Sequence, residues 1–123
     1  MKKCFAAAIA LAALATPASA QVAVGGWVLA QWKGDQYWFP GVVTAVKDGR
    51  VTIKYDDGTT EIRPINQVKS YDWHVNSKVQ CRWTDGKWYG AKITSANADG
   101  LHISVLYDDG DRQDTTTGKC RSL

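Results

Sequence analysis

"VTIKYDDGTTEI" at residues 51–62 and "ISVLYDDGDRQD" at residues 103–114 are nearly the same sequence, and they decide the fold. In both stretches, alternating apolar residues lead into the tetrapeptide Tyr-Asp-Asp-Gly. An alternation with a period of two is typical of a half-buried strand, and Asp-Gly favours the positive φ angles of a tight hairpin turn. The two stretches therefore predict two equivalent hairpins in one chain.

The likeness extends on both sides of these hairpins. "VLAQW" at residues 28–32 matches "VQCRW" at 79–83, and "YWFPGVVTAV" at 37–46 matches "KWYGAKITSA" at 87–96, so that the offset drifts only from 50 to 52 residues along the chain. A repeat with nearly constant spacing indicates that each copy is one structural unit, with short insertions confined to loops.

Each copy contains short runs that predict strands, and neither copy has a helical periodicity. The first copy has runs at residues 27–32, 38–46, 50–55, 59–63 and 67–70, and the second at 78–83, 88–95, 101–107, 112–115 and around Cys120. Five strands in about 50 residues bury a core only by curling into a small barrel. We therefore expect an all-β chain with a five-stranded barrel at residues 21–70, a short linker at 71–74 and a second barrel at 75–123.

The sequence "MKKCFAAAIALAALATPASA" at residues 1–20 has the features of a secretory signal peptide. It begins with two lysines, continues with an apolar run and ends in an Ala-x-Ala cleavage site. No later stretch is apolar for long enough to form a membrane helix. These features predict a periplasmic or secreted protein without a membrane span.

Cleavage after residue 20 removes Cys4 and leaves Cys81 and Cys120. An even pair of cysteines in an exported chain predicts a disulfide, which would close a loop of about 40 residues and stabilise the fold by roughly 4 kcal/mol. The alternatives are two free thiols or a metal site, but two cysteines without nearby histidines do not make a zinc site. We expect neither a metal nor a cofactor.

The charge of the mature chain is close to zero. The full chain has 15 Lys and Arg and 12 Asp and Glu, and loss of Lys2 and Lys3 leaves 13 − 12 = +1. Nucleic-acid binding needs a dense basic patch that neutralises phosphates. The mature charge therefore argues against DNA or RNA as the partner.

The order of the motifs resembles the Tudor and agenet class of SH3-like barrels, here in tandem and of an exported bacterial type. The resemblance rests on Ala30-x-Trp32, on Trp38-Phe39, on the hairpin glycine and on Tyr-Asp-Asp-Gly, with a second set at Cys81-x-Trp83 and Trp88-Tyr89, and it covers essentially the whole mature chain. It implies that the first and last strands of each barrel are neighbours. That arrangement would bring Cys81 close to Cys120.

Tudor-like domains that bind methylated lysine or arginine hold the cation in an aromatic cage beside a carboxylate. The resemblance implies two such sets, Trp32, Phe39, Tyr55 and Asp57 in the first copy and Trp83, Tyr89, Tyr107 and Asp109 in the second. Thr59 and Asp111 stand where cage-forming members often have another aromatic, so each cage would have three walls. The alternative is structural, because large rings at strand ends also close a small core and Asp-Asp-Gly forms hairpins without any ligand.

Trp38 and Trp88 have the opposite strand parity and point away from the core in the pattern. They are either parts of a seam between the barrels or exposed anchors for a partner. The linker at residues 71–74, "YDWH", is short enough to force the barrels together, which favours the seam. Trp27 and Trp73 would then lie near it.

The sequence as a whole predicts an exported, non-enzymatic binding module that recognises a cationic group, either a methylated or unmodified Lys or Arg side chain or a quaternary ammonium. An alternative is a cell-envelope domain that binds protein or peptidoglycan through an outer face. His74 and His102 are the only side chains suited to general base catalysis near neutral pH, and neither stands in a nucleophile motif, so no catalytic residue is expected. The pattern does not identify the ligand.

Overall fold

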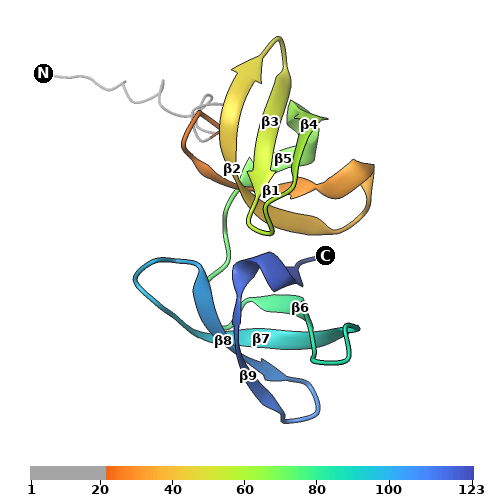
Figure 1. The fold of residues 1–123 in the computed structure, drawn as a ribbon, viewed down its shortest axis with the longest axis vertical. Coiled ribbons are helices and arrows are strands. Elements are labelled where there is room, and N and C mark those ends of the chain that lie inside the picture. Colours follow the sequence, from red (N-terminus) through yellow and green to blue (C-terminus); the bar gives the residue numbers. More distant parts are fainter. Residues whose placement is uncertain (1–21) are drawn as a thin grey trace, which may run out of the picture.

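A computed structural model describes residues 22–123 of the chain, which form two small β-barrels stacked along the long axis of the molecule (Figure 1). The predicted signal peptide at residues 1–20 lies outside the described residues. Among residues 22–123, no helix is long and apolar enough to cross a membrane.

The first barrel is one antiparallel sheet in the order β4-β3-β2-β1-β5. Short 3-10 turns at Trp32–Gly34 (η3) and Ile65–Gln67 (η4) join some of its strands. Its strands are β1 (Trp27–Gln31), β2 (Trp38–Lys47), β3 (Arg50–Tyr55), β4 (Thr60–Pro64) and β5 (Val68–Ser70).

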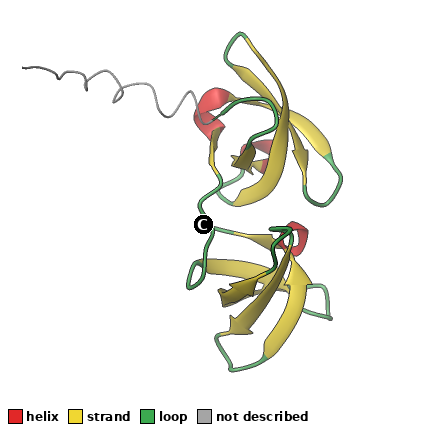
Figure 2. Ribbon diagram, turned by 90° about the vertical axis from the view of Figure 1, so that its left-hand side faces the viewer, coloured by secondary structure: helices red, strands yellow, loops and turns green. Residues whose placement is uncertain are grey.

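The second barrel repeats this arrangement in the order β10-β6-β7-β8-β9. It also has a 3-10 turn before its last strand, η5 (Thr117–Lys119). Its strands are β6 (Lys78–Arg82), β7 (Trp88–Ala96), β8 (His102–Tyr107), β9 (Arg112–Thr116) and β10 (Cys120–Arg121). Strands and loops thus account for nearly all of both barrels (Figure 2), and the prediction of two tandem five-stranded units is confirmed.

The strand bounds agree with the sequence prediction to within one or two residues, with one difference that matters for the site. The predicted first strand included Trp32, but β1 ends at Gln31 and Trp32 begins the turn η3. The chain leaves the sheet there because Lys33 and Gly34 have φ angles of 53° and 76°, which no strand accommodates.

The first and last strands of each barrel are neighbours, as the resemblance implied. In the first barrel β1 pairs with β5, and in the second β6 pairs with β10. Cys120 stands directly opposite Cys81 in the second pair, and the two form a disulfide across 39 positions of sequence. The predicted covalent link therefore joins the two ends of the second barrel.

Each barrel has its own apolar core, but one fully buried residue of the first barrel packs in the core of the second. Leu29 of β1 is fully buried and packs in the core of the second barrel with residues such as Trp73. Its neighbours Val28 and Ala30 face the core of the first barrel, so β1 has no solvent-facing side over these three residues. The barrels therefore share a buried apolar contact.

The C-terminal end of the chain lies between the two barrels (Figures 1 and 2) and joins them through the backbone. The amide of Trp38 donates to the carbonyl of Ser122 at 2.8 Å, and the amide of Ser122 donates to the carbonyl of Trp38 at 2.9 Å. Trp38 also packs against the core of the second barrel. The prediction that Trp38 belongs to a seam is confirmed.

Trp27 and Trp73 lie at the same seam. Trp73 is buried in the second core, while the outer edge of the Trp27 ring rests on Gly100 in the turn between β7 and β8. A Cβ atom on Gly100 would come within 2.2 Å of Trp27, and Gly100 has a φ of +71°. Glycine is required there by both the backbone angle and the neighbouring ring.

Gly100→Ala is expected to lower the free energy of unfolding by about 1 kcal/mol more than Gly49→Ala, measured by urea denaturation. Gly49 is the matched control, because it has the same turn position in the first copy and a φ of +76°, but nothing lies within 4 Å of its added Cβ. Both variants carry the strain of a left-handed alanine, about 1–2 kcal/mol. Equal losses would show that Trp27 does not pack on Gly100 in solution.

Candidate functional site

The four residues of the first predicted cage come together in the structure. The Trp32 and Tyr55 rings meet edge to face at 5.5 Å between centroids, and Phe39 meets Tyr55 at 6.4 Å. All three rings and Asp57 line a cleft of about 730 Å³ that runs between the barrels. Tyr55 itself is only 4 % exposed and belongs to the first core. Its ring therefore closes the barrel, as the structural alternative expected.

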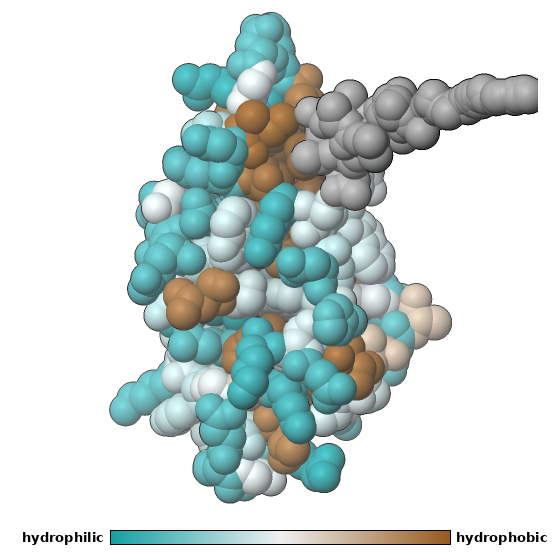
Figure 3. Space-filling model, turned by 180° about the vertical axis from the view of Figure 1, so that it is seen from behind, coloured by the Kyte–Doolittle hydropathy of each residue, from teal (hydrophilic) through white to brown (hydrophobic). Residues whose placement is uncertain are grey.

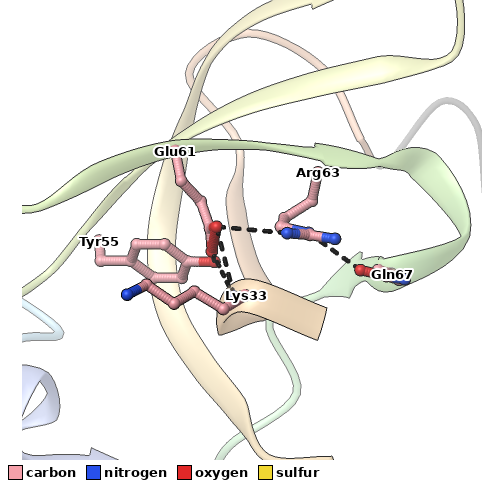
Figure 4. Close-up of polar contacts among 5 residues, drawn as sticks. All are labelled: Lys33, Tyr55, Glu61, Arg63 and Gln67. Carbon is pink, nitrogen blue, oxygen red and sulfur yellow. Dashed lines mark hydrogen bonds and ion pairs between the residues drawn. The ribbon is translucent and has the colours of Figure 1, made fainter. Parts of the chain in front are cut away.

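A carboxylate that sequence reasoning missed lies beneath this mouth. Figure 4 shows Glu61 among three donors: the Tyr55 hydroxyl at 2.9 Å, the Lys33 backbone amide at 2.9 Å and the Arg63 guanidinium at 3.5 Å. Burial, reinforced by the bond to Glu61, raises the pKa of Tyr55 far above its usual range. The charge of Glu61 is therefore already matched within the first barrel.

The remaining groups of the first mouth also have partners within the barrel. The ammonium of Lys33 lies 5.3 Å from the centroid of the Trp32 ring, within the range of a cation–π contact. Asp57 accepts from the backbone amide of Thr59 at 2.9 Å and from its hydroxyl at 2.7 Å. The first copy of Tyr-Asp-Asp-Gly is thus a capped hairpin turn, and the neighbouring Trp32 ring already contacts the chain's own lysine.

The second predicted cage forms a separate pocket of about 290 Å³. Trp83, Tyr89, Tyr107 and Asp109 all line it. Tyr107 meets Trp83 edge to face at 5.3 Å and is 4 % exposed, so it closes the core like Tyr55, whereas Tyr89 is 42 % exposed. The Trp83 and Tyr89 rings are therefore the aromatic groups of this pocket that a ligand can reach.

The second pocket is strongly acidic. Its lining contains three carboxylates besides Asp109 and neither lysine nor arginine, the additional residues being Asp85, Asp108 and Asp111. The Tyr89 hydroxyl donates to Asp85 at 2.6 Å, and this bond lowers the pKa of Asp85 below its usual range. Where the first barrel has Glu61 beside its buried tyrosine, the second has the neutral Gln113, which accepts from the Tyr107 hydroxyl at 2.5 Å. The negative charge is consequently concentrated at the rim.

Sequence reasoning identified only part of this rim. Asp109 was predicted as the carboxylate of the cage, Asp108 was recognised only as a turn residue, and Asp111 only as the position of a missing aromatic. Asp85 gave no signal, because it lies in the separate β6–β7 turn and reaches the pocket through folding alone.

The Tyr-Asp-Asp-Gly turn has a different role in the first copy. Asp56, the equivalent of Asp108, accepts from the hydroxyl of Thr117 at 2.5 Å and thereby contacts the second barrel. Thr117 is fully buried at the seam between the barrels. Burial raises the pKa of Asp56, and the Thr117 hydrogen bond offsets part of this effect. The first copy therefore uses its hairpin to join the barrels, and the second uses it to line a pocket.

Asp56→Asn is expected to change stability in a pH-dependent way. The folded pKa of Asp56 lies above the unfolded one, so the folded state binds the proton more tightly and the wild type gains stability as the pH falls through the folded pKa towards the unfolded value near 3.8. The difference in unfolding free energy between wild type and variant should therefore shift towards the wild type from pH 7 to pH 3 in urea titrations. A constant difference, or a shift the other way, would contradict burial of this carboxyl.

The wall of the cleft opposite Phe39 is formed by Trp88. Its ring lies 6.1 Å from that of Phe39, so Trp88 is half-buried in the seam, as its parity allowed. Two guanidinium groups lie against it, those of Arg82 at 5.0 Å and Arg121 at 4.2 Å from the ring centroid. Arg121 also lies 3.6 Å from the ring centroid of Tyr37 in the first barrel.

The two histidines lie outside both cavities. The His102 ring bonds Asp99 at 2.6 Å, and the His74 ring contacts the carbonyl of Val75 at 2.8 Å. No group of three or more metal-ligating side chains occurs among residues 22–123.

Residues 26–71 match the sequence family described as the DNA repair protein Crb2 Tudor domain. The match runs from the residue before β1 to just after β5, so it covers the first barrel. No curated protein matches the chain at a significant level.

Two solved structures of tandem Agenet domains are similar to the chain. One is the ADCP1 tandem Agenet domain 3-4, with 14 % identity, a TM-score of 0.39 and coverage of 85 % of this chain and 82 % of that one. The other is Arabidopsis thaliana AGDP1 AGD34, with 15 % identity, a TM-score of 0.39 and coverage of 85 % and 84 %.

Proposed function

We propose that the protein is an exported, non-enzymatic binding module that holds a cationic group in the pocket of its second barrel. The ligand group is a methylated or unmodified Lys or Arg side chain on a peptide, or a quaternary ammonium. Trp83 and Tyr89 provide aromatic faces, Tyr107 closes the floor, and Asp109 supplies charge at the rim. The disulfide between Cys81 and Cys120 supports export, because such bonds persist in oxidising compartments.

The combination of aromatic faces with four carboxylates, in a pocket lined by no basic side chain, carries this proposal. A poorly hydrated cation is attracted both by the ring quadrupoles and by the surrounding carboxylates. A volume of about 290 Å³ suits one side-chain head group rather than a larger ligand.

The first barrel is the weaker candidate for the same chemistry. Trp32, Phe39, Tyr55 and Asp57 are assembled there, but Lys33 lies over the ring of Trp32 and Glu61 is already paired. A ligand cation at this mouth would be repelled by the lysine and by the basic side chains Arg82, Lys119 and Arg121 that line the same cleft. We therefore assign the first set to the wall of the cleft between the barrels.

The alternative, a cell-envelope domain that binds through an outer face, would use Trp38 and Trp88 as exposed anchors. Both are half-buried in the seam, where Trp38 packs against the second core and Trp88 meets Phe39. Their positions favour the pocket over an outer tryptophan face.

The proposal is tested by titrating the oxidised protein with a trimethyl-lysine peptide and with choline while tryptophan fluorescence is recorded. Trp83→Ala is expected to weaken binding about 5- to 30-fold, because it removes a cation–π contact worth about 1–2 kcal/mol. Trp32→Ala should change the dissociation constant less than threefold.

Asp109→Asn and Asp57→Asn form a second, matched pair. Each aspartate accepts from a backbone amide within its turn, from Asp111 at 3.0 Å and from Thr59 at 2.9 Å, and asparagine can keep that bond. Asp109→Asn should weaken cation binding about threefold, because an exposed charge contributes below about 1 kcal/mol, and Asp57→Asn should leave it unchanged. Binding whose dissociation constant is unchanged by Trp83→Ala would overturn the proposal.

A further inference from the structure

Three basic side chains from the second barrel line the cleft between the barrels: Arg82, Lys119 and Arg121. They come from separate places in the sequence, the end of β6, the turn η5 and the last strand β10. The cleft gathers them on one wall, opposite the rings contributed by the first barrel. This wall has no counterpart in the acidic pocket, although Trp83 lines both cavities.

Within the described part of the chain, the basic side chains of this wall lack a direct ion pair, although Asp35 lies near enough to interact with Arg121. Among residues 22–123, none of the three forms an ion pair with a carboxylate. Arg121 donates from Nε to the neutral amide oxygen of Gln80 at 3.0 Å, which leaves its two terminal nitrogens for other partners. Burial lowers the pKa of Arg121, the charges of Tyr37 and Asp35 offset part of this effect, and the charge of Arg82 adds to it.

The two guanidinium groups are held in place before any ligand arrives. Arg82 and Arg121 both lie against Trp88, and Arg121 also lies against Tyr37, so aromatic contacts restrict their planes. A stacked guanidinium still presents its N–H edge, which matches the two oxygens of a carboxylate or a phosphate. Such preorganisation lowers the conformational entropy lost on binding.

The rest of the cleft favours a single carboxylate over a polyanion. Asp35 and Asp57 line the same cavity and would repel a run of phosphates. Trp32 and Phe39 provide apolar surface, and a volume of about 730 Å³ accommodates several residues of a peptide rather than one ion.

We propose that the cleft between the barrels binds a carboxylate of a peptide through Arg82, Lys119 and Arg121, with the neighbouring peptide side chains against Trp32 and Phe39. This site is separate from the cation pocket but adjoins it at Trp83. The preferred ligand therefore carries a basic side chain and an acidic one a few residues apart. The inference that one peptide carries both a basic and an acidic side chain rests on the proposed function of the second pocket. The carboxylate site itself does not.

The test uses three sets of capped peptides and isothermal titration calorimetry on the oxidised protein. The first set has trimethyl-lysine with a glutamate two, three or four residues away. The second set has glutamine in place of that glutamate, and the third keeps the glutamate but has alanine in place of the trimethyl-lysine. We expect the best glutamate peptide of the first set to bind about tenfold more tightly than its glutamine partner, and the third set to bind weakly.

Two double variants distinguish a specific carboxylate site in the cleft from a general effect of the protein's positive charge on peptide affinity. Arg82→Gln with Lys119→Gln should remove the preference for glutamate, while Arg112→Gln with Lys92→Gln should keep it. All four residues are exposed on the second barrel, and the control pair lines neither cavity. Near-ultraviolet circular dichroism confirms folding of each variant.

Equal affinity for glutamate and glutamine peptides, or loss of the preference in the control pair as well, would overturn the carboxylate site. Binding of the glutamine peptides would still support the cation pocket in that case. Conversely, binding of the alanine peptides alone would support the carboxylate site and contradict the cation pocket.

Discussion

The paired backbone hydrogen bonds between Trp38 and Ser122 are the contact on which the rest of the structure depends. They attach the C-terminal end of the second barrel to the first, and the disulfide at Cys120 ties that same end to β6. Two domains joined by a short linker otherwise move relative to each other. Here Leu29 in the second core and the bond from Thr117 to Asp56 add a buried apolar contact and a polar one. The cleft between the barrels has a defined shape because this joint fixes both walls.

The contacts at the seam also explain why the two copies of the repeat have different surroundings. In the first copy the Tyr-Asp-Asp-Gly hairpin contacts the second barrel at the seam, and the aromatic residues line the cleft. Lys33 contacts the Trp32 ring there, and Glu61 accepts a hydrogen bond from Tyr55. In the second copy the hairpin lies away from the seam, and its aspartates stay exposed around the pocket. The tandem arrangement therefore produces one acidic cavity and one mixed cavity rather than two equal ones. Figure 3 shows that apolar side chains on the rear face form small separate patches rather than one continuous surface.

Much of the fold could be predicted because its signals are local. Alternation, Asp-Gly turns and the repeat gave the strands to within one or two residues, and the neighbouring first and last strands brought Cys81 to Cys120. The seam had a signal that went unused: Val28, Leu29 and Ala30 form an unbroken apolar run, whereas the second copy has Gln80 at the place of Leu29. A strand with no polar face is buried on both sides.

The candidate site was harder to predict because long-range contacts decide its chemistry. The aromatic sets could be named from the motif, but their electrostatics could not. Asp56 and Thr117 are 61 residues apart, and Arg121 meets Tyr37 only because β10 lies in the joint. No local pattern distinguishes a carboxylate that caps a turn from one that faces a pocket.

The six tryptophans offer a direct measurement, because each contributes one indole N–H resonance to a nitrogen–proton correlation spectrum. Titration with trimethyl-lysine should shift the Trp83 resonance saturably and leave the buried Trp73 unchanged, with Trp32 responding weakly if at all. The resonances are assigned through single Trp→Phe variants. A shift of Trp32 at equal or lower ligand concentration, with Trp83 unmoved, would contradict the division of roles between the two barrels.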